Sequence, residues 1–410
     1  MNNKKSKLID FLSVLRTLTA ALFIPLLISP QGLEGLFLMN AFVWGIMIFI
    51  TQRQSLEYVL GNKLFWVNLC YPALLYLIVN ITNGLFIRHS ILLPIIIFYL
   101  LFYYENGGFQ SIEYRIGMGT AVGYLILIHF YTIYMLNKDV DISRNLASSA
   151  YSEQYANMWT GGYDHIYLTM LGSICLFAII LKCKENRLRW GLFLLEMIQM
   201  VLLFKAGYTM ALLFTVGGFM LIILLGVKEN RKLWLIILTG MLLFPLIVMA
   251  GREILMFLAE HVSNRYMHNR LVEVANLLKF SGLKKNGSID GRLSLYRLSA
   301  ETFFHHPLIG VGNSDSLRKV LYGGHSTIID KLANFGLIGG GTYLALILYN
   351  FKSICKRITK KHRYIYMAVF LIYFLLSVVN ITDLTALNAV VFLIIPAGIC
   401  IYSDREQMKK

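Results

Sequence analysis

The stretch YTMALLFTVGGFMLIILLGVKENRK, residues 208–232, decides the class of fold. Residues 208–227 hold no charged side chain, and about 20 apolar residues in a helix are enough to cross the hydrocarbon core of a bilayer. The following segment, KENRK, is rich in basic residues, which is typical of the cytoplasmic end of a span. This stretch therefore predicts a transmembrane helix whose C-terminal end faces the cytoplasm.

Similar apolar runs recur along the chain and predict about twelve spans. They are expected at residues 10–29, 33–51, 64–81, 90–104, 116–136, 164–181, 190–204, 208–227, 233–250, 328–350, 364–381 and 384–402. The fold class expected is thus all-α, in a polytopic integral membrane protein. With 57% apolar and 15% charged residues, the composition excludes an ordinary soluble domain. Nucleic acid is not an expected partner, in spite of a net charge of +16.

The basic segments between the spans set the orientation. When twelve spans are threaded, the N-terminal MNNKKSK, the short Lys/Arg-rich loops and the tail SDREQMKK all fall on one side, which is the cytoplasmic side. We therefore expect both termini in the cytoplasm. The predicted organisation is spans 1–9 in residues 1–250, an extracytoplasmic layer in residues 251–327, and spans 10–12 with a cytoplasmic tail in residues 328–410.

The 251–327 layer carries ten basic and six acidic residues. Long loops do not follow the rule that orients short ones, so this excess is free to serve a ligand. Because the arginine side chain fits phosphate oxygens, Arg297 and Arg318 are candidates for binding a lipid phosphate or pyrophosphate. Attraction to anionic phospholipids at the membrane surface is the alternative interpretation.

Residues 290–349 read DGRLSLYRLSAETFFHHPLIGVGNSDSLRKVLYGGHSTIIDKLANFGLIGGGTYLALILY. The helical pattern is interrupted by four glycines, namely Gly310, Gly312, Gly323 and Gly324. Such a loop lets the backbone approach a ligand or cross another helix closely. His325 then stands at the outer end of the tenth span, where its near-neutral pKa makes it a candidate general base. The alternatives for His325 are a helix cap and a hydrogen-bonded interface residue.

This segment resembles the signature of the O-antigen polymerase and ligase superfamily, which includes Wzy-type polysaccharide polymerases and lipopolysaccharide ligases. The resemblance lies in a Gly-Arg that opens a helix, a Pro-(hydrophobic)2-Gly-x-Gly turn from Pro307, a His-Ser pair at the head of the next span, and a Gly-(apolar)2-Gly element from Gly336 to Gly339. It implies a GT-C-like membrane glycosyltransferase with one large extracytoplasmic helical loop. In such a protein the 251–327 layer would be catalytic.

The resemblance also implies roles for individual residues. Arg292 matches the essential loop arginine of the family and would neutralise the pyrophosphate of the lipid donor as it leaves. His325 matches the catalytic histidine that orients or deprotonates the acceptor hydroxyl. Where the family has a Ser-Arg pair at the outer end of a middle span, this chain has Lys205 and Tyr208. Lys205 would act on the same phosphate as a point charge, and Tyr208 is a candidate to contact the substrate beside it.

The implied enzyme polymerises oligosaccharide repeat units, carried on undecaprenyl pyrophosphate, into capsular polysaccharide, exopolysaccharide or O-antigen on the outer face of the bacterial cytoplasmic membrane. Its expected partners are these lipid-linked oligosaccharides, membrane lipids, and a flippase and a chain-length regulator of the same pathway. No cofactor is expected, because the donor already carries an activated leaving group. A ligase that moves finished polymer to another acceptor is the alternative within the family. A transporter or flippase of lipid-linked sugars is the alternative from a different class.

Other polar positions give weaker signals. Asp164, at the outer start of the sixth span, is predicted either to line the acceptor path or to cap that helix. Arg16 in the first span and Glu196 in the seventh are hypothesised to form an ion pair within the membrane. Asp383, between the last two spans, is expected to be solvated. No group of residues has the spacing of a metal site.

Overall fold

The computed structural model describes residues 2–29, 33–82, 89–105, 111–139, 142–146, 159–226, 254–262, 265–277, 288–314, 316–318 and 320–408. Within these ranges every regular element is a helix, and no β-strand is present. The prediction of an all-α protein is therefore confirmed.

The helices follow the chain in two groups. The N-terminal group comprises α1 (Asn2–Leu27), α2 (Glu34–Thr51), α3 (Arg53–Gly61), α4 (Lys63–Thr82), α5 (His89–Glu105), α6 (Ile112–Lys138), α7 (Ile142–Asn145), α9 (Tyr163–Lys182), α10 (Asn186–Ala206) and α11 (Thr209–Gly226). The C-terminal group comprises α13 (Arg265–Leu277), α14 (Ser288–His305), α15 (Thr327–Gly336), η2 (Leu337–Gly341), α16 (Thr342–Arg357), α17 (Arg363–Val379), α18 (Thr385–Ala389), η3 (Val390–Ile394) and α19 (Ile395–Met408). The elements η2 and η3 are π-helical turns that join the helices on either side of them.

Six helices in the described residues are long and apolar enough to cross a membrane, or seven if the bent pair of α2 and α3 is one span. The six are Lys63–Thr82, Ile112–Lys138, Tyr163–Lys182, Thr209–Gly226, Thr327–Arg357 and Thr385–Arg405. Three shorter apolar helices lie in α1, α5 and α17. A polytopic membrane protein is thus confirmed, whereas the number of twelve spans stays a prediction. The seventh predicted span falls in α10, which is not among these apolar helices, and the ninth, residues 233–250, lies outside the described residues.

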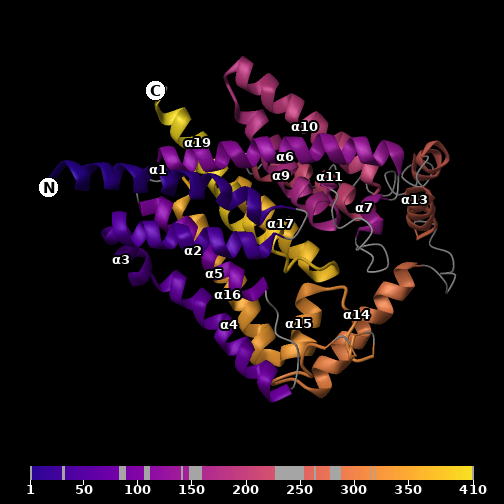
Figure 1. The fold of residues 1–410 in the computed structure, drawn as a ribbon. Coiled ribbons are helices and arrows are strands. Elements are labelled where there is room, and N and C mark those ends of the chain that lie inside the picture. The colour runs from indigo at the N-terminus through magenta and orange to yellow at the C-terminus, as the bar shows by residue number, and fades with distance from the viewer. Residues whose placement is uncertain are drawn as a thin grey trace.

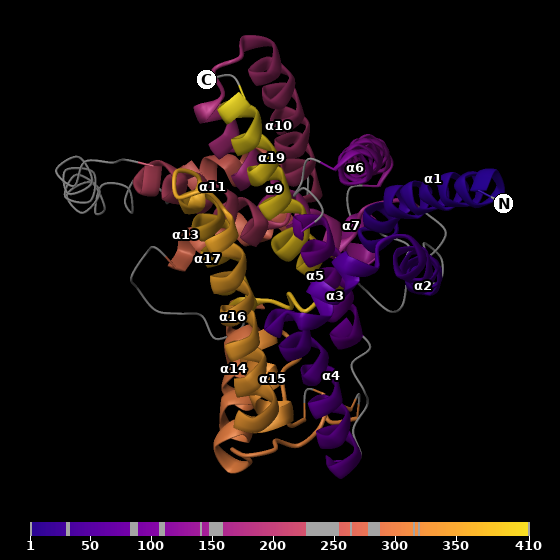
Figure 2. The same ribbon diagram turned by 90° about the vertical axis from the view of Figure 1, so that its left-hand side faces the viewer.

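The helices pack in groups that bring distant parts of the chain together. α1 packs against α2 and α6, and α9 packs against α10, α11 and α17. A third group joins α14 to α15 and α16 to α4, and Figure 2 shows these four helices running together at the lower end of the molecule. In Figure 1 the two chain ends lie at the left, and α7, α13 and α14 lie towards the right.

The chain crosses itself at the C-terminal end of α15. The Leu337 amide donates to the Pro307 carbonyl at 2.8 Å, and the Gly312 amide donates to the Asn334 carbonyl at 2.8 Å. Gly336 has a φ of +59°, and a Cβ at this position would lie 2.3 Å from the Leu308 carbonyl group. The glycine therefore permits a backbone crossing that satisfies groups left unpaired at the end of the helix. Of the two roles that the glycine pattern left open, the crossing of a helix is the one seen here.

Gly336→Ala is expected to lower the free energy of unfolding by about 2 kcal/mol or more, because it combines a left-handed conformation with a clash against backbone. The matched control is Gly341→Ala, whose Cβ would meet only the Leu337 side chain, at 3.8 Å. Thermal unfolding of the purified protein in detergent measures both. Equal decreases in Tm for the two variants would contradict the conclusion that the backbone crossing requires a glycine at position 336.

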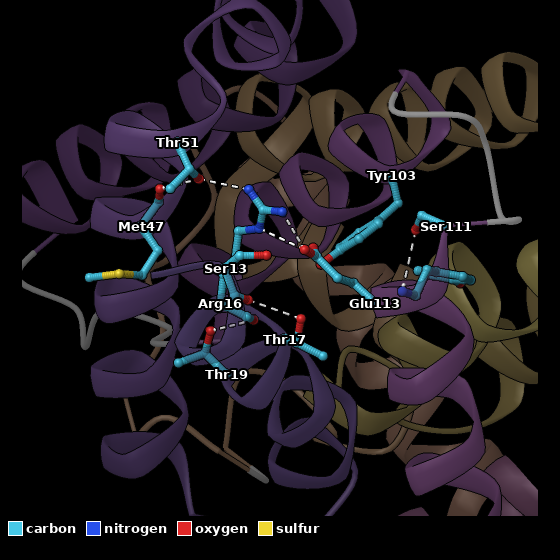
Figure 3. A network of polar contacts seen from close by, with 10 residues as sticks. Ser13, Arg16, Thr17, Thr19, Met47, Thr51, Tyr103, Ser111 and Glu113 are labelled. Atoms are coloured by element: carbon cyan, nitrogen blue, oxygen red, sulfur yellow. Dashed lines mark hydrogen bonds and ion pairs between the residues drawn. The ribbon is translucent and has the colours of Figure 1, made fainter. Parts of the chain in front are cut away.

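A buried polar network joins four helices of the N-terminal group, α1, α2, α5 and α6 (Figure 3). The Arg16 Nε donates to the Glu113 carboxylate at 2.8 Å, and Nη1 donates to the Thr51 hydroxyl at 2.6 Å. The Tyr103 hydroxyl donates to the other Glu113 oxygen at 3.2 Å. Arg16 and Glu113 are only 6% and 7% exposed, so each charge is neutralised inside the protein.

The expected Arg16–Glu196 ion pair is therefore wrong. α6 begins at Ile112, earlier than the span predicted from residue 116, and this extra turn places Glu113 against α1. Glu196 instead accepts a hydrogen bond from the Ser173 hydroxyl of α9. The prediction failed because depth in the membrane does not determine which helices are neighbours.

Glu113→Gln is expected to cost about 3–5 kcal/mol of stability, because it leaves the Arg16 charge buried without a counter-ion. The control is Glu57→Gln, which breaks the exposed Arg53–Glu57 pair of α3 and is expected to cost less than about 0.5 kcal/mol. Denaturation in detergent compares the two variants. A Glu113→Gln protein as stable as the Glu57→Gln protein would refute the assignment.

Candidate functional site

The 379–383 turn, which links α17 to α18, receives hydrogen bonds from two other helices. The Tyr296 hydroxyl of α14 donates to the Val379 carbonyl at 2.6 Å. The Tyr163 hydroxyl of α9 donates to the Ile381 carbonyl at 3.2 Å. These contacts bring the helix that carries Arg292 and the start of α9 to the same turn, although 129 residues separate Arg292 from Tyr163 in the sequence.

The N-terminus of α15 is bound to the same turn. The Thr327 amide donates to the Asn380 carbonyl at 3.1 Å, and the Thr327 hydroxyl accepts from the Thr382 amide at 2.6 Å. The N-cap of α15 is Ser326, whose hydroxyl accepts from the Ile329 amide at 3.1 Å. The residue that caps α15 is thus Ser326, which follows His325. The alternative that His325 caps this helix is therefore not observed. His325 itself is half-buried beside the turn.

Arg292 lies near the two tyrosines that contact the turn. Its guanidinium group interacts electrostatically with the hydroxyls of both Tyr163 and Tyr296. Burial raises the pKa of the Tyr296 hydroxyl, and the positive charge of Arg292 opposes that rise. The two residues to which the family resemblance assigns catalytic roles, Arg292 and His325, are therefore held by elements that converge on one turn.

Tyr208 belongs to a cluster of aromatic rings next to this turn. Its ring centroid lies 6.2 Å from that of Tyr163 and 6.0 Å from that of Tyr167. The hydroxyl of Tyr208 donates to the Ser143 carbonyl at 2.9 Å, and the hydroxyl of Tyr167 accepts from the Asn380 side chain at 2.9 Å. The sequence analysis singled out Tyr208 but missed both Tyr163 and Tyr167. The only signal for them was their position at the outer start of an apolar run.

Arg318 contacts the residue that precedes His325 in the sequence. Its Nη2 donates to the Gly324 carbonyl at 3.3 Å, and Gly324 has a φ of +68°. This contact places an exposed guanidinium group one residue away from His325 along the chain. The Arg318 side chain is thus bonded to the backbone of the residue that precedes His325.

Three further residues, Lys205, Arg297 and Asp164, were also predicted to contact the substrate. The Lys205 amine donates to the Asn137 side chain at 2.5 Å and is exposed. Arg297 pairs with Glu301 at 2.7 Å, with 81% of the arginine side chain exposed. Asp164 is the second residue of α9, whose N-cap is Gly162, so it does not cap this helix, although its charge suits the helix N-terminus.

Asp383 is not solvated as expected. Its carboxylate lies 2.6 Å from the Lys331 amine of α15, and the two side chains are 12% and 6% exposed. The Lys331 amine also lies 4.4 Å from the centroid of the Tyr343 ring. The expectation failed because α15 turns this lysine inward, where its charge needs a counter-ion. The pair adds another link between α15 and the 379–383 turn.

A second carboxylate joins α14 to α15. Asp330 is 8% exposed and accepts from the Ser299 hydroxyl at 2.6 Å and from the Ser326 amide at 2.8 Å. The Ser299 hydroxyl in turn accepts from the Gly323 amide at 2.8 Å. These hydrogen bonds connect α14, the helix that carries Arg292, to residues that precede and follow His325 in the sequence. All of the residues that form them are buried.

Removal of Asp330 tests this connection. Asp330→Ala is expected to cost about 2–3 kcal/mol, because a hydrogen bond to a charged group is lost and buried donors lose their acceptor. In a double-mutant cycle with Ser299→Ala, the coupling energy is expected to be about 1.5 kcal/mol or more. Denaturation in detergent measures all four proteins. Strictly additive effects would show that the two side chains do not act together.

No group of three or more His, Cys, Asp or Glu side chains in the described ranges is arranged to hold a metal ion. The described residues of this site offer guanidinium groups, an imidazole and tyrosine hydroxyls.

Residues 197–344 match the family model described as O-antigen ligase. The matched range includes Lys205, Tyr208, Arg292 and His325, and it ends before the 379–383 turn. No curated protein matches the chain.

Proposed function

We propose that this membrane protein, whose residues 197–344 carry the O-antigen ligase domain of the polymerase and ligase superfamily, polymerises lipid-linked oligosaccharide repeat units. The reaction would take place on the outer face of the bacterial cytoplasmic membrane and would yield capsular polysaccharide, exopolysaccharide or O-antigen. The observation that carries the proposal is the convergence of the Arg292 helix and the His325 loop on the 379–383 turn.

The donor would be the growing chain on undecaprenyl pyrophosphate. Its bond between the anomeric carbon and the pyrophosphate oxygen breaks, and the charge that develops on that oxygen is neutralised by Arg292. Arg318, which is bonded to the residue before His325, is proposed to bind the same phosphates, because a guanidinium group can contact two oxygens at once. No nucleotide is needed, because the pyrophosphate is already a good leaving group.

The acceptor would be a single lipid-linked repeat unit. Its sugar hydroxyl attacks the anomeric carbon, and the hydroxyl proton passes to an imidazole nitrogen of His325. A displacement in one step inverts the configuration of that carbon. The aromatic side chains of Tyr163 and Tyr208 flank the site, and Lys205, Arg297 and Asp164 are proposed to contact more distant parts of the substrate. Lys205 and Arg297 are exposed, so both are accessible to such parts of the substrate.

Ligation is the second candidate function, because the matching family model is described as O-antigen ligase. A ligase would use the same donor and the same two residues, but it would transfer the finished polymer to a different acceptor. The two reactions differ in their products, so the length and the attachment of the glycan distinguish them.

His325→Ala and Arg292→Ala are expected to reduce long-chain glycan at least about 100-fold, because each removes a group that acts in the transition state. The variants are expressed in a strain that lacks the protein, and surface glycan is resolved by length. The matched controls are His305→Ala, an exposed histidine at the end of α14, and Arg265→Ala, an exposed arginine of α13.

The glycan found in these strains distinguishes polymerisation, ligation and a wrong assignment of the site. Single repeat units on the surface of the His325→Ala strain, with normal membrane insertion, support polymerisation. Long lipid-linked chains that are not attached to their acceptor indicate a ligase. An unchanged ladder of long chains in both site variants would refute the assignment of Arg292 and His325.

A further inference from the structure

A cavity lies at the end of α16 that is farthest along the chain from His325. It has a volume of about 320 Å³ and lies where α4 begins and where α5 and α16 end. The residues that line it are Asn62, Leu64, Tyr104, Tyr349, Ser353, Lys356 and Arg357. By the predicted topology these helix ends face the cytoplasm, because α16 leads into the basic loop KSICKRITKKHR. We propose that this cavity binds the phosphate-bearing headgroup of an anionic phospholipid of the inner leaflet.

Of the described residues that line the cavity, two are cations, Lys356 and Arg357, and none is an anion. In the part of the chain that the structure describes, neither Lys356 nor Arg357 pairs with a carboxylate. Residues 351–363 contain no acidic residue, and Glu57 of α3 is held by Arg53. A phosphate group would supply the missing negative charge.

Arg357 is held in place before any ligand arrives. Its Nη1 donates to the Ser353 carbonyl at 2.8 Å, and its guanidinium carbon lies 5.3 Å from the centroid of the Tyr104 ring. Its Nε is buried and makes no hydrogen bond among the described residues. A side chain fixed in this way loses little conformational freedom on binding an anion, which favours affinity.

The start of α4 adds a further positive potential. Asn62 and Leu64, which line the cavity, flank the first residue of this helix, and the Asn62 side chain accepts from the Leu64 amide at 3.0 Å. Helix N-termini carry a partial positive charge that favours phosphate. Because the arginine, the lysine and the helix end share one sign, the cavity selects an anion.

The surroundings favour a lipid over a soluble phosphate. Trp66, Leu60 and Leu348 are 48%, 41% and 44% exposed, and the Trp66 indole donates to the Leu60 carbonyl at 2.5 Å. Tryptophan with its nitrogen bonded and its ring exposed is typical of the membrane–water interface. These three exposed apolar residues lie within two positions in the sequence of residues that line the basic cavity, an arrangement that suits the acyl chains and the headgroup of one phospholipid.

Binding at this cavity would act on the span that leads to the catalytic loop. α15, η2 and α16 form one stretch of 31 helical residues, Thr327–Arg357, whose first residue follows His325 by two positions. A lipid held by Arg357 would therefore fix the inner end of the helix whose outer end positions the histidine. The site itself does not depend on which glycan reaction the protein performs.

The test uses the delipidated full-length protein in detergent, incubated with phosphatidylglycerol or with phosphatidylcholine, and counts the retained lipids by native mass spectrometry. The pocket variant is Lys356→Gln with Arg357→Gln, and the matched control is Lys352→Gln with Lys360→Gln. Both lose two charges from the same helix end and loop, but neither control residue lines the cavity. Circular dichroism and thermal unfolding check that each variant folds. If the pocket variant does not fold, Lys356→Gln alone replaces it.

We expect the pocket variant to bind phosphatidylglycerol about tenfold or more weakly than the wild type, since each direct Lys or Arg contact contributes about fivefold. The control should change less than about twofold, because detergent presents no anionic surface to distant lysines. Equal losses in both variants, or equal binding of the two lipids by the wild type, would overturn the proposal. Pyrophosphate is added as a competitor, and its displacement of the lipid at micromolar concentration would assign the cavity to a soluble phosphate instead.

Discussion

The geometry around Arg292 and His325 depends on the hydrogen bonds of the 379–383 turn. A bilayer cannot satisfy the backbone groups of a turn, so non-helical backbone near the membrane must find its partners within the protein. Here the partners are the hydroxyls of Thr327, Tyr163 and Tyr296 and the Thr327 amide. Because these groups belong to different helices, the same bonds that satisfy the turn also fix α9, α14 and α15 relative to one another.

The sequence predicted the helices far better than their neighbours. The stretch 208–232 predicted a span, and the structure has α11 at Thr209–Gly226, because apolar length and flanking charge are local properties. Pairing between helices is not local: Arg16 contacts Glu113 across 97 residues. An ionisable residue inside a span predicts that a partner exists, but several carboxylates at similar depth satisfy that requirement equally well.

The site was predictable to the extent that it rests on short motifs. Arg292 and His325 stand in recognisable strings, and the Gly336 position needs a residue that tolerates positive φ. Tyr163 and Tyr296 were not found, since the chain has 24 tyrosines and nothing local marks the ones that face a buried turn. The Lys331–Asp383 pair was missed for a similar reason, because each residue reads as solvated until α15 is packed against the 379–383 turn.

The charges of the described residues fall into two kinds with different physical roles. Buried cations such as Arg16 and Lys331 have a carboxylate partner inside the protein, which removes the cost of holding a lone charge in a medium of low dielectric constant. Arg292 in the candidate site and Arg357 in the cavity at the end of α16 are only partly buried and, in the described parts of the chain, have no such partner. A cation that the fold has positioned but not neutralised retains its attraction for an external anion. The proposals that Arg292 binds the pyrophosphate of a lipid-linked glycan and that Arg357 binds a phospholipid headgroup rest on this same property.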